Sequence, residues 1–424
     1  MDVWTNLCFR CNIYPIEAFG TYNSCIFAAQ NTLKMMKRLS IISIFMILFA
    51  IHSMAWERVS TQLDLANNAD PNKAVVYDLW KSFVEAHNDS TTDFPQWNDA
   101  DKIKWKYPDL VNCDGYLTTD LYSYLNKVIE IRPENDVYVI RSMFFTPYNE
   151  NTEIYVLAIT NHIAKKDENG EFKLYNWIDY NTRNWPRKAV GVFDYCYYPG
   201  FDFNEDIARE ANNTVTMFRD KLGANVPNRI TYYIAQNEDE EFKIKGFDYV
   251  VGMGDHVGNT GGSTDTNNFI VYGDSVHGES FEPEICRATL NATYPNVHFL
   301  LNQGIAGYVH QGNEEFGLTY RQHYQRMKDW LEAHPDDDIA NYYSSFYIMD
   351  NQTAPTYLVG KIVCYELYKK GGYDALKRAF KTKPTVEDFF AFLKKEIGID
   401  QKDFNQWMRK QIAKYTTQDI PPLR

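Results

Sequence analysis

The sequence lacks several features that would assign it to a common functional class. Positive charge is not in excess, because 43 Lys and Arg residues stand against 56 Asp and Glu residues, giving a formal net charge of −13 at pH 7. Without a basic stripe or patch, nucleic acid is not an expected partner. The chain also contains no internal repeat and no low-complexity segment. What remains is a chain of ordinary globular composition, with 45% hydrophobic and 23% charged residues.

Cysteine is scarce and irregularly spaced. The seven cysteines include a single Cys-x-x-Cys pair at 8–11, with no second pair that would complete a metal site. Cys286 and Cys364 fall in apolar helical patterns, which predicts buried free thiols. The sequence leaves a Cys113–Cys196 disulfide open, because spacing alone does not determine a pairing.

A secretory signal is the clearest feature of the N-terminal region. Lys37 and Arg38 precede an apolar run over 39–51, and the residues 53–55, Ser-Met-Ala, form a small-x-small cleavage pattern. The apolar run is too short to span a bilayer comfortably. This order of charged, apolar and small residues predicts a signal peptide.

The signal predicts export to the periplasm, the cell surface or the medium. We expect 36–55 to be removed, so that the mature chain begins at Trp56, and 1–35 to come from an over-extended reading frame. If the segment is not cleaved, 39–55 becomes a single-pass anchor, the one membrane contact expected.

The first half of the mature chain predicts an α+β domain over 56–200. At 424 residues the chain is long enough for two domains with sizeable cores. Residues rich in β-branched and aromatic side chains indicate strands at 137–145 and 153–164. The turn sequence Asp-Glu-Asn-Gly at 167–170 is expected to join the second of these to 172–178 as an antiparallel hairpin.

Further elements complete this predicted domain without adding chemistry. Apolar spacing indicates helices at 73–87 and 117–128, and a strand at 189–198. His162 and Asp194 stand alone as polar residues in these patterns, which favours structural roles for both.

A second domain is expected over 201–424. It opens with a helix over 204–222 capped by Asn204, followed by a strand at 230–235. The Gly-rich loop at 252–262 has no Lys after its glycines and leads into a strand, so it does not predict a phosphate-binding loop. After residue 310 the pattern is all-helical, with helices expected at 320–333, 354–370, 373–380, 386–396 and 401–415.

The stretch 276–310 organises this second domain. Its first part predicts a buried amphipathic helix, in which Phe281 and Ile285 are apolar and which Pro295 ends. A second apolar helix follows over 299–306 and carries the sequence Asn-Gln-Gly-Ile-Ala.

The residues 283–287, Pro-Glu-Ile-Cys-Arg, align with the zinc-binding pattern His-Glu-x-x-His, and 302–306 resembles Asn-Glu-Gly-(Ile/Leu)-Ala. The ending Lys-Lys-Gly-Gly-Tyr at 369–373, with Asp-Phe-Asn-Gln-Trp at 403–407, is similar to a gluzincin helical tail. Over about 190–415 the chain therefore resembles gluzincin zinc peptidases, which implies a thermolysin-like domain with a mostly helical C-terminal part.

The resemblance implies that the zinc ligands are lost. Pro283, Arg287 and Gln303 stand at the three ligand positions, and Glu284 remains as the relict general base. Proline offers no ligand atom, guanidinium repels a cation and a neutral amide binds zinc poorly. We therefore expect no metal or other cofactor and no peptidase activity.

Two other kinds of site compete with this hypothesis, a nucleophilic hydrolase site at Ser280 and a metal site with different ligands. Ser280 lacks the second Gly of a nucleophile elbow, and its position favours a helix N-cap. A different metal site would draw on His277, Glu279, Glu282, His298 and His310.

The pattern also predicts how the empty site is filled. Arg287 is one helical turn from Glu284 and is expected to pair with it, with Gln303 hydrogen-bonded to one of the two; otherwise Glu284–Arg287 is an ordinary surface pair. The cleft would be completed by Glu279, His277, Asn302 and Tyr308, beside an edge strand at 268–272.

The predicted function is that of an exported pseudo-peptidase that binds a peptide, a glycan or an envelope protein. In gluzincins the edge strand holds an extended peptide, which the resemblance implies for 268–272. The alternatives are an active zinc peptidase or hydrolase with non-standard ligands, and a structural envelope protein.

Overall fold

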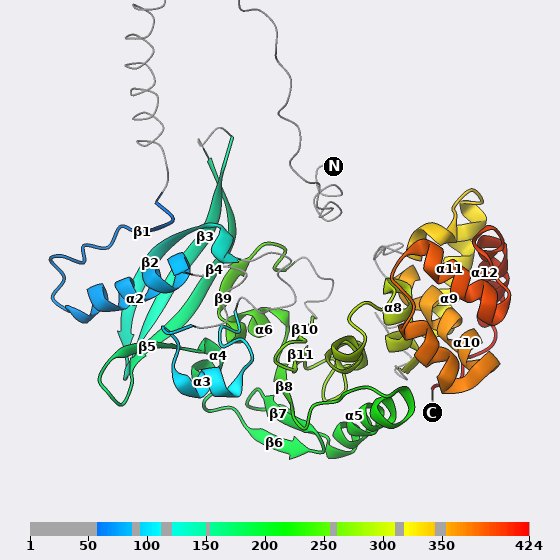
Figure 1. The fold of residues 1–424 in the computed structure, drawn as a ribbon, viewed down its shortest axis with the longest axis horizontal. Helices are drawn as coiled ribbons and strands as arrows, with labels where there is room; N and C mark the ends of the chain where they lie inside the picture. Colours follow the sequence, from blue (N-terminus) through cyan, green and yellow to red (C-terminus); the bar gives the residue numbers. More distant parts are fainter. Residues whose placement is uncertain are drawn as a thin grey trace, which may run out of the picture. The chain divides into compact units, whose positions relative to one another are not determined.

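The computed structural model describes residues 57–86, 94–111, 121–149, 153–254, 261–309, 318–343 and 353–423. Contacts between residues divide the chain into two units, Met1–Trp56 and Glu57–Arg424, and every described residue belongs to the second. Figure 1 shows this unit to contain two β-sheets and a group of C-terminal helices. The expected α+β fold is confirmed.

The first sheet has the strand order β1-β2-β3-β4-β5, with β9 also paired to β4. The pairings are antiparallel except that β1 runs parallel to β2. Asp167 and Gly170 form the turn between β4 and β5, as expected, with Gly170 at φ 82°. The strands are β1 (Val59–Thr61), β2 (Leu125–Glu134), β3 (Val137–Tyr148), β4 (Glu153–Lys166), β5 (Phe172–Tyr175) and β9 (Phe247–Val250).

Helix α2 (Asn72–Ala86) covers one face of the first sheet. Its buried residues Val76, Trp80 and Phe83 recur at helical spacing and pack into one core with sheet residues such as Ile140. Each such large apolar side chain contributes about 1.5–3 kcal/mol by leaving water. The indole N–H of Trp80 donates to Asn126 Oδ1 at 2.9 Å, so the polar end of the ring is also satisfied.

The second sheet has the order β10-β11-β8-β7-β6, with parallel strands in its centre and an antiparallel pair at each edge. Because β6 and β7 precede residue 200 and β9 follows it, the predicted domain boundary at 200 does not separate the two sheets. The strands are β6 (Arg187–Val190), β7 (Phe193–Tyr197), β8 (Ile230–Ala235), β10 (Ser263–Asp265) and β11 (Ile270–Asp274).

Three sequence expectations need correction at the level of secondary structure. The helix expected at 117–128 is wrong over Leu125–Val128, which lie in β2 because pairing with β1 and β3 overrides the local pattern. The strand expected at 189–198 is two strands, joined by a turn at Gly191 with φ 59°. The expected edge strand is β11, but it has neighbours on both sides, and β10 is the edge.

The helices around the second sheet begin as expected. Asn204 caps α5 (Glu205–Met217) by accepting hydrogen bonds from the backbone N–H of Asp206 and Ile207, and a π-helical turn continues it to Leu222. The short helices between the sheets were not predicted, because at five to eight residues each is too short to show a helical period of apolar side chains. They are α3 (Asp99–Lys104), α4 (Trp177–Asn181) and α6 (Glu238–Lys245).

The C-terminal helices surround their own apolar core. The backbones of α8 and α10 pack closely at Gly304 and Gly360. A Cβ built on Gly304 would lie 2.3 Å from the carbonyl carbon of Gly360. Gly371 and Gly372 leave helical geometry, which confirms the predicted break. The helices are α8 (Phe299–Val309), α9 (Tyr320–Ala333), α10 (Pro355–Phe380), α11 (Val386–Ile397) and α12 (Gln401–Tyr415).

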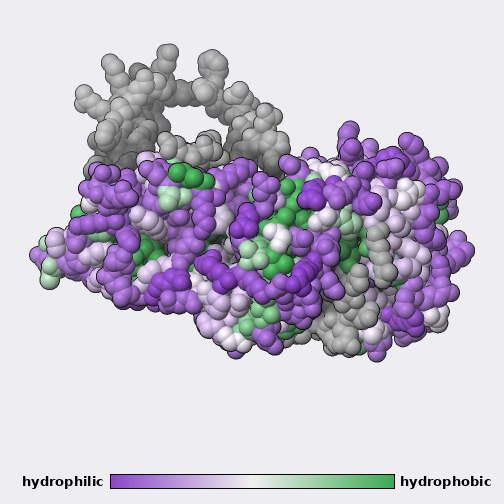
Figure 2. Space-filling view, turned by 90° about the horizontal axis from the view of Figure 1, so that it is seen from below, coloured by the Kyte–Doolittle hydropathy of each residue, from purple (hydrophilic) through white to green (hydrophobic). Residues whose placement is uncertain are grey.

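The hydropathy of the surface and the length of the helices are the features that decide whether a protein contacts or crosses a membrane. On the face shown in Figure 2, hydrophilic residues cover most of the surface, with hydrophobic residues in small groups between them. No helix within the described ranges combines the length and the apolar character that crossing a bilayer requires. The expected signal peptide at 36–55, the segment 1–35, Trp56 and His310 lie outside the described residues.

Candidate functional site

The candidate site is built on α7 (Glu282–Cys286), which follows the last strand of the second sheet and continues as a π-helical turn over Arg287–Asn291. Pro283 lies in the first turn, where its missing N–H removes no intrahelical hydrogen bond, as predicted. Ser280 is not the cap that the sequence suggested. The N-cap residue is Phe281, and the Ser280 hydroxyl instead donates to Glu282 Oε1 at 3.0 Å.

Glu284 and Arg287 form the ion pair that was expected. The Arg287 Nη1 donates to Glu284 Oε1, and the glutamate side chain is 3% exposed whereas the arginine side chain is 30% exposed. Two partners were not expected. The Thr264 hydroxyl on β10 donates to Glu284 Oε2 at 2.5 Å, and Arg287 Nη2 donates to the Tyr357 hydroxyl on α10 at 3.0 Å. Both carboxylate oxygens of Glu284 therefore accept hydrogen bonds.

Gln303 does not join this pair by a hydrogen bond in the described part of the chain. It lies in α8 and is 6% exposed, with its Oε1 buried and without a partner. The expected hydrogen bond from Gln303 is thus absent from the site, and Thr264 and Tyr357 take its place. A buried amide oxygen without a donor costs stability, so Gln303 adds no stabilising hydrogen bond through Oε1 at this position.

The residues at the three ligand positions do not fit a zinc ion. Pro283 has no ligand atom, and the Arg287 guanidinium contacts the carboxylate that would activate a metal-bound water. Across the described ranges, no three His, Cys, Asp or Glu side chains gather into a group that could hold a metal ion. We therefore assign no metal-dependent reaction to these residues.

The remaining cleft candidates lie in separate environments. His277 Nδ1 is 2.8 Å from Asp274 Oδ1, and its ring stacks on Phe281 at 3.7 Å between centroids. Glu279 is buried and accepts a hydrogen bond from the backbone N–H of Asn204 at the start of α5. Both residues fix the loop between β11 and α7, so they serve to position that helix.

Asn302 and Tyr308 do not extend the site either. Tyr308 is 1% exposed and packs edge-on against Tyr365 and Tyr368 in the helical core. Asn302 is half-buried, and its backbone N–H donates to the carbonyl of His298 in the first turn of α8. Among the described residues, the side chains that hydrogen-bond to the Glu284–Arg287 pair are those of Thr264 and Tyr357, and not those of Asn302 or Tyr308.

The titration behaviour of the nearby groups follows from their burial. Burial raises the pKa of Glu279, against the effect of the hydrogen bond from Asn204. Burial also acts to raise the pKa of Asp274, but the hydrogen bond from His277 holds that pKa below its ordinary value. Burial lowers the pKa of His298 to about 4, and its ring stacks on Phe389. His298 is therefore a core residue, which argues against it as an alternative metal ligand.

No local sequence pattern predicts that Thr264 and Tyr357 contact this pair. They come from positions 20 and 70 residues away along the chain and reach the pair only through the fold. In comparison with known proteins, no family model and no curated protein matches the chain.

Proposed function

We propose that this chain is an exported, catalytically inactive protein of gluzincin-like build, which binds a ligand without cleaving it. The observation that supports this most is the Glu284–Arg287 pair, because a guanidinium stands where the resemblance places a histidine ligand. Export to the periplasm, the cell surface or the medium is part of the proposal and rests on the signal sequence at 36–55.

The chemistry of the pair explains why hydrolysis is not expected. A general base accepts a proton from water, and this requires a carboxylate oxygen that the water can approach within hydrogen-bond distance. Glu284 uses Oε1 for Arg287 and Oε2 for Thr264. The permanent positive charge of Arg287 further holds the carboxylate in an ion pair, where transfer of a proton to it from water is disfavoured.

The edge strand narrows the class of ligand. β10 has only three residues, and Ser263, Thr264 and Asp265 are all buried. A peptide that adds to a sheet edge needs an accessible row of backbone groups. We therefore favour a ligand other than an extended peptide at this position, which leaves a glycan or a folded envelope protein.

A restoration experiment tests the proposal. The triple variant Pro283→His, Arg287→His and Gln303→Glu returns the three ligand types of the family pattern, while Arg287→His alone serves as the matched control. We expect calorimetric titration to show one zinc per chain for the triple variant and none for the control. If the triple variant folds but binds no zinc, the gluzincin-like build is contradicted.

A further inference from the structure

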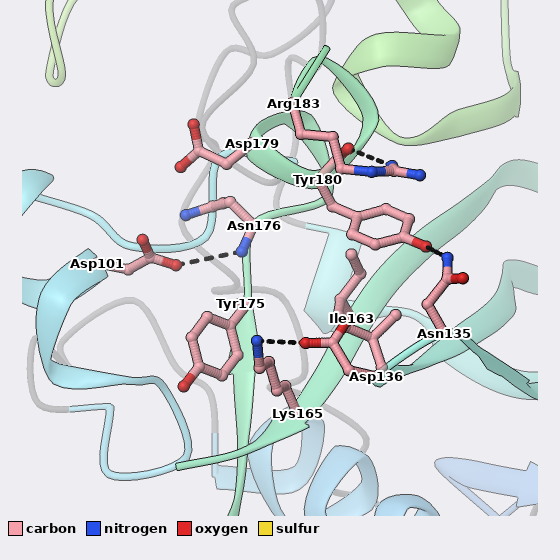
Figure 3. Close-up of a pocket in the computed structure, with 11 residues that line it drawn as sticks. Asp101, Asn135, Asp136, Ile163, Lys165, Tyr175, Asn176, Asp179, Tyr180 and Arg183 are labelled. Carbon is pink, nitrogen blue, oxygen red and sulfur yellow. Dashed lines mark hydrogen bonds and ion pairs between the residues drawn. The ribbon is translucent and has the colours of Figure 1, made fainter. Parts of the chain in front are cut away.

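A separate hollow lies on the first sheet, away from the Glu284–Arg287 pair. Its volume is about 600 Å³, within the roughly 300–1,000 Å³ that small-molecule sites occupy. Strand alternation places it on the face opposite α2, because Ala164 and Leu174 belong to the core with α2 whereas Ile163 and Tyr175 line the hollow. Figure 3 shows its lining residues.

The floor of the hollow is made by neighbouring strands. Ile163 of β4 lies opposite Tyr175 of β5 in the strand register, and Lys165 follows two residues later on the same face. Val137 at the start of β3 extends the apolar part of this floor. The Tyr175 hydroxyl makes no hydrogen bond within the described residues, so the floor presents an aromatic ring with an unused polar end.

One wall comes from α4 and the turn between β2 and β3. Asn135, in the left-handed region with φ 55°, donates from Nδ2 to the Tyr180 hydroxyl at 3.0 Å. That hydroxyl donates to Glu134 Oε1 at 2.9 Å. The Arg183 guanidinium lies 3.9 Å over the Tyr180 ring and leaves several N–H groups without a carboxylate. This wall is rigid and rich in donors.

The other wall joins a buried carboxylate to a buried amide. Asp101 Oδ2 accepts from Asn98 Nδ2 at 2.8 Å and from the backbone N–H of Asn176 at 3.2 Å, which leaves Asp101 Oδ1 without a hydrogen bond in the described chain. Asn176 is 4% exposed, and its Nδ2 has no partner. In the view of Figure 3 the Asn176 amide lies between the carboxylates of Asp101 and Asp179.

The charges of the lining select against several ligand classes. Asp101, Asp136 and Asp179 line the hollow together with Lys165 and Arg183, three carboxylates against two cations. Lys165 is paired with Asp136 at 2.5 Å. Asp179 is paired in turn with Lys104 at 3.1 Å, so Asp101 and Arg183 are the lining charges without an ion-pair partner among the described residues. With one such charge of each sign, the hollow has no net charge that would favour an ion over a neutral polar ligand.

Part of this polarity has a structural role. Asp101 helps to close the N-terminus of α3 with Asn98, and the Tyr180–Asn135 hydrogen bond ties α4 to a turn. That role does not account for the unused Tyr175 hydroxyl, Asp101 Oδ1 and Asn176 Nδ2. Asn176 Nδ2 is buried and has no partner, which is uncommon for a polar group, whereas Asp101 Oδ1 and the Tyr175 hydroxyl are open to the hollow. Together they offer an amide donor, a carboxylate acceptor and a hydroxyl to a ligand that both donates and accepts.

We propose that this hollow binds one or two rings of a neutral saccharide. Sugar hydroxyls donate to Asp101 Oδ1 and accept from amide and guanidinium N–H groups, while the C–H face of the ring packs on Tyr175. The proposal rests on residues of the first sheet and of the adjoining α3 and α4, and it stands apart from the peptidase-like proposal.

The test is a titration of the purified full chain with free neutral sugars. The panel contains glucose, galactose, mannose, N-acetylglucosamine and their β-linked disaccharides, with glucose 6-phosphate and glucosamine as charged comparators. We expect saturation-transfer NMR and calorimetry to detect at least one neutral sugar, and Tyr175→Ala and Asp101→Asn each to weaken it about tenfold or more. Tyr155→Ala, an exposed tyrosine of β4 outside the hollow, is the matched control and should leave binding unchanged.

The outcomes are decisive in both directions. If Asp101→Asn unfolds, Tyr175→Phe provides the second variant, because it removes only the hydroxyl. Binding of a neutral sugar that Arg287→Ala leaves intact supports the hollow independently of the peptidase-like site. The proposal is overturned if no neutral sugar binds, if only glucosamine or glucose 6-phosphate binds, or if the Tyr175 variants bind as the parent does.

Discussion

Among single residues, Glu284 shows how this protein compensates a buried charge. Glu284 is 3% exposed and has two partners, Arg287 and Thr264. A buried carboxylate that loses its cation keeps the cost of desolvation and loses most of the compensation. The arginine is therefore more important for stability than a surface arginine would be.

Removing Arg287 alone should cost more than removing both charges. We expect Arg287→Ala to lower the free energy of unfolding by about 2–3 kcal/mol, less than for a fully buried pair because the guanidinium is partly exposed. Adding Glu284→Gln should restore part of that loss. Thermal unfolding of the four proteins in this double-mutant cycle measures the coupling, and additive effects would contradict the contact.

A matched control is available on α5. Arg209 pairs with Glu205 and Asp206 but is 55% exposed. Arg209→Ala should change the unfolding free energy by less than about 1 kcal/mol.

Lys361 provides a pH-dependent prediction. It is 5% exposed, its ammonium lies over the Tyr320 ring, and burial lowers its pKa from 10.5 to about 7. Between about pH 7 and pH 10 the unfolded chain binds a proton at this lysine that the folded chain does not, so stability rises with pH. Relative to Lys361→Met, the parent should gain up to about 1.4 kcal/mol per pH unit in this window.

Denaturant unfolding at several pH values checks this sign. Lys361→Met should be more stable than the parent at pH 7, because it removes the burial cost of an ionisable group. Lys369→Met, on the same helix but 45% exposed, should follow the parent curve. Parallel curves for the parent and Lys361→Met would contradict the lowered pKa.

At the scale of elements, the packing of α8 on α10 holds Gln303 in place. A Cβ on Gly304 would lie 2.3 Å from Gly360 backbone atoms, so neither helix can accept a side chain at this crossing. We expect Gly304→Ala to destabilise the protein by about 3 kcal/mol or more, measured by chemical denaturation.

Gly307 is the matched control on the same helix. A Cβ there would lie 3.4 Å from the nearest atom, the Tyr357 carbonyl oxygen, which is ordinary contact. Gly307→Ala should therefore be neutral or stabilising by about 0.5–1 kcal/mol through helix propensity. Equal losses for both variants would show that the close approach is not what limits Gly304.

Elements with strong local signals were predictable from the sequence. The helices at 320–333 and 401–415 match α9 and α12 residue for residue, and Thr319 supplies a full capping box for the first of them. β2 was missed over Leu125–Val128, because its strand conformation depends on pairing with distant strands.

The candidate site was predictable only in part. Glu284 and Arg287 are three residues apart on one helix, so their pairing follows from local geometry. Thr264 and Tyr357 reach the pair through long-range packing, which no sequence spacing encodes. The hollow beside Tyr175 is lined by four separate segments of the chain, which long-range packing also brings together.

At the scale of the whole molecule, the chain divides between Trp56 and Glu57. The predicted signal peptide ends one residue earlier, at Ala55, and its removal stays a prediction. N-terminal sequencing of the exported protein should begin at Trp56, because the charged, apolar and small-residue regions precede it in order. An exported chain that starts before residue 35 would contradict the assignment.

For the whole protein, we propose the build of a zinc peptidase without the metal or the peptidase activity. The most direct measurement is the zinc content of the purified parent protein after equilibration with excess zinc, together with a peptide-cleavage assay with and without a chelator. We expect far less than one zinc per chain and no peptide cleavage, because Pro283, Arg287 and Gln303 cannot form a three-ligand site. One tightly bound zinc per chain with chelator-sensitive cleavage would contradict it.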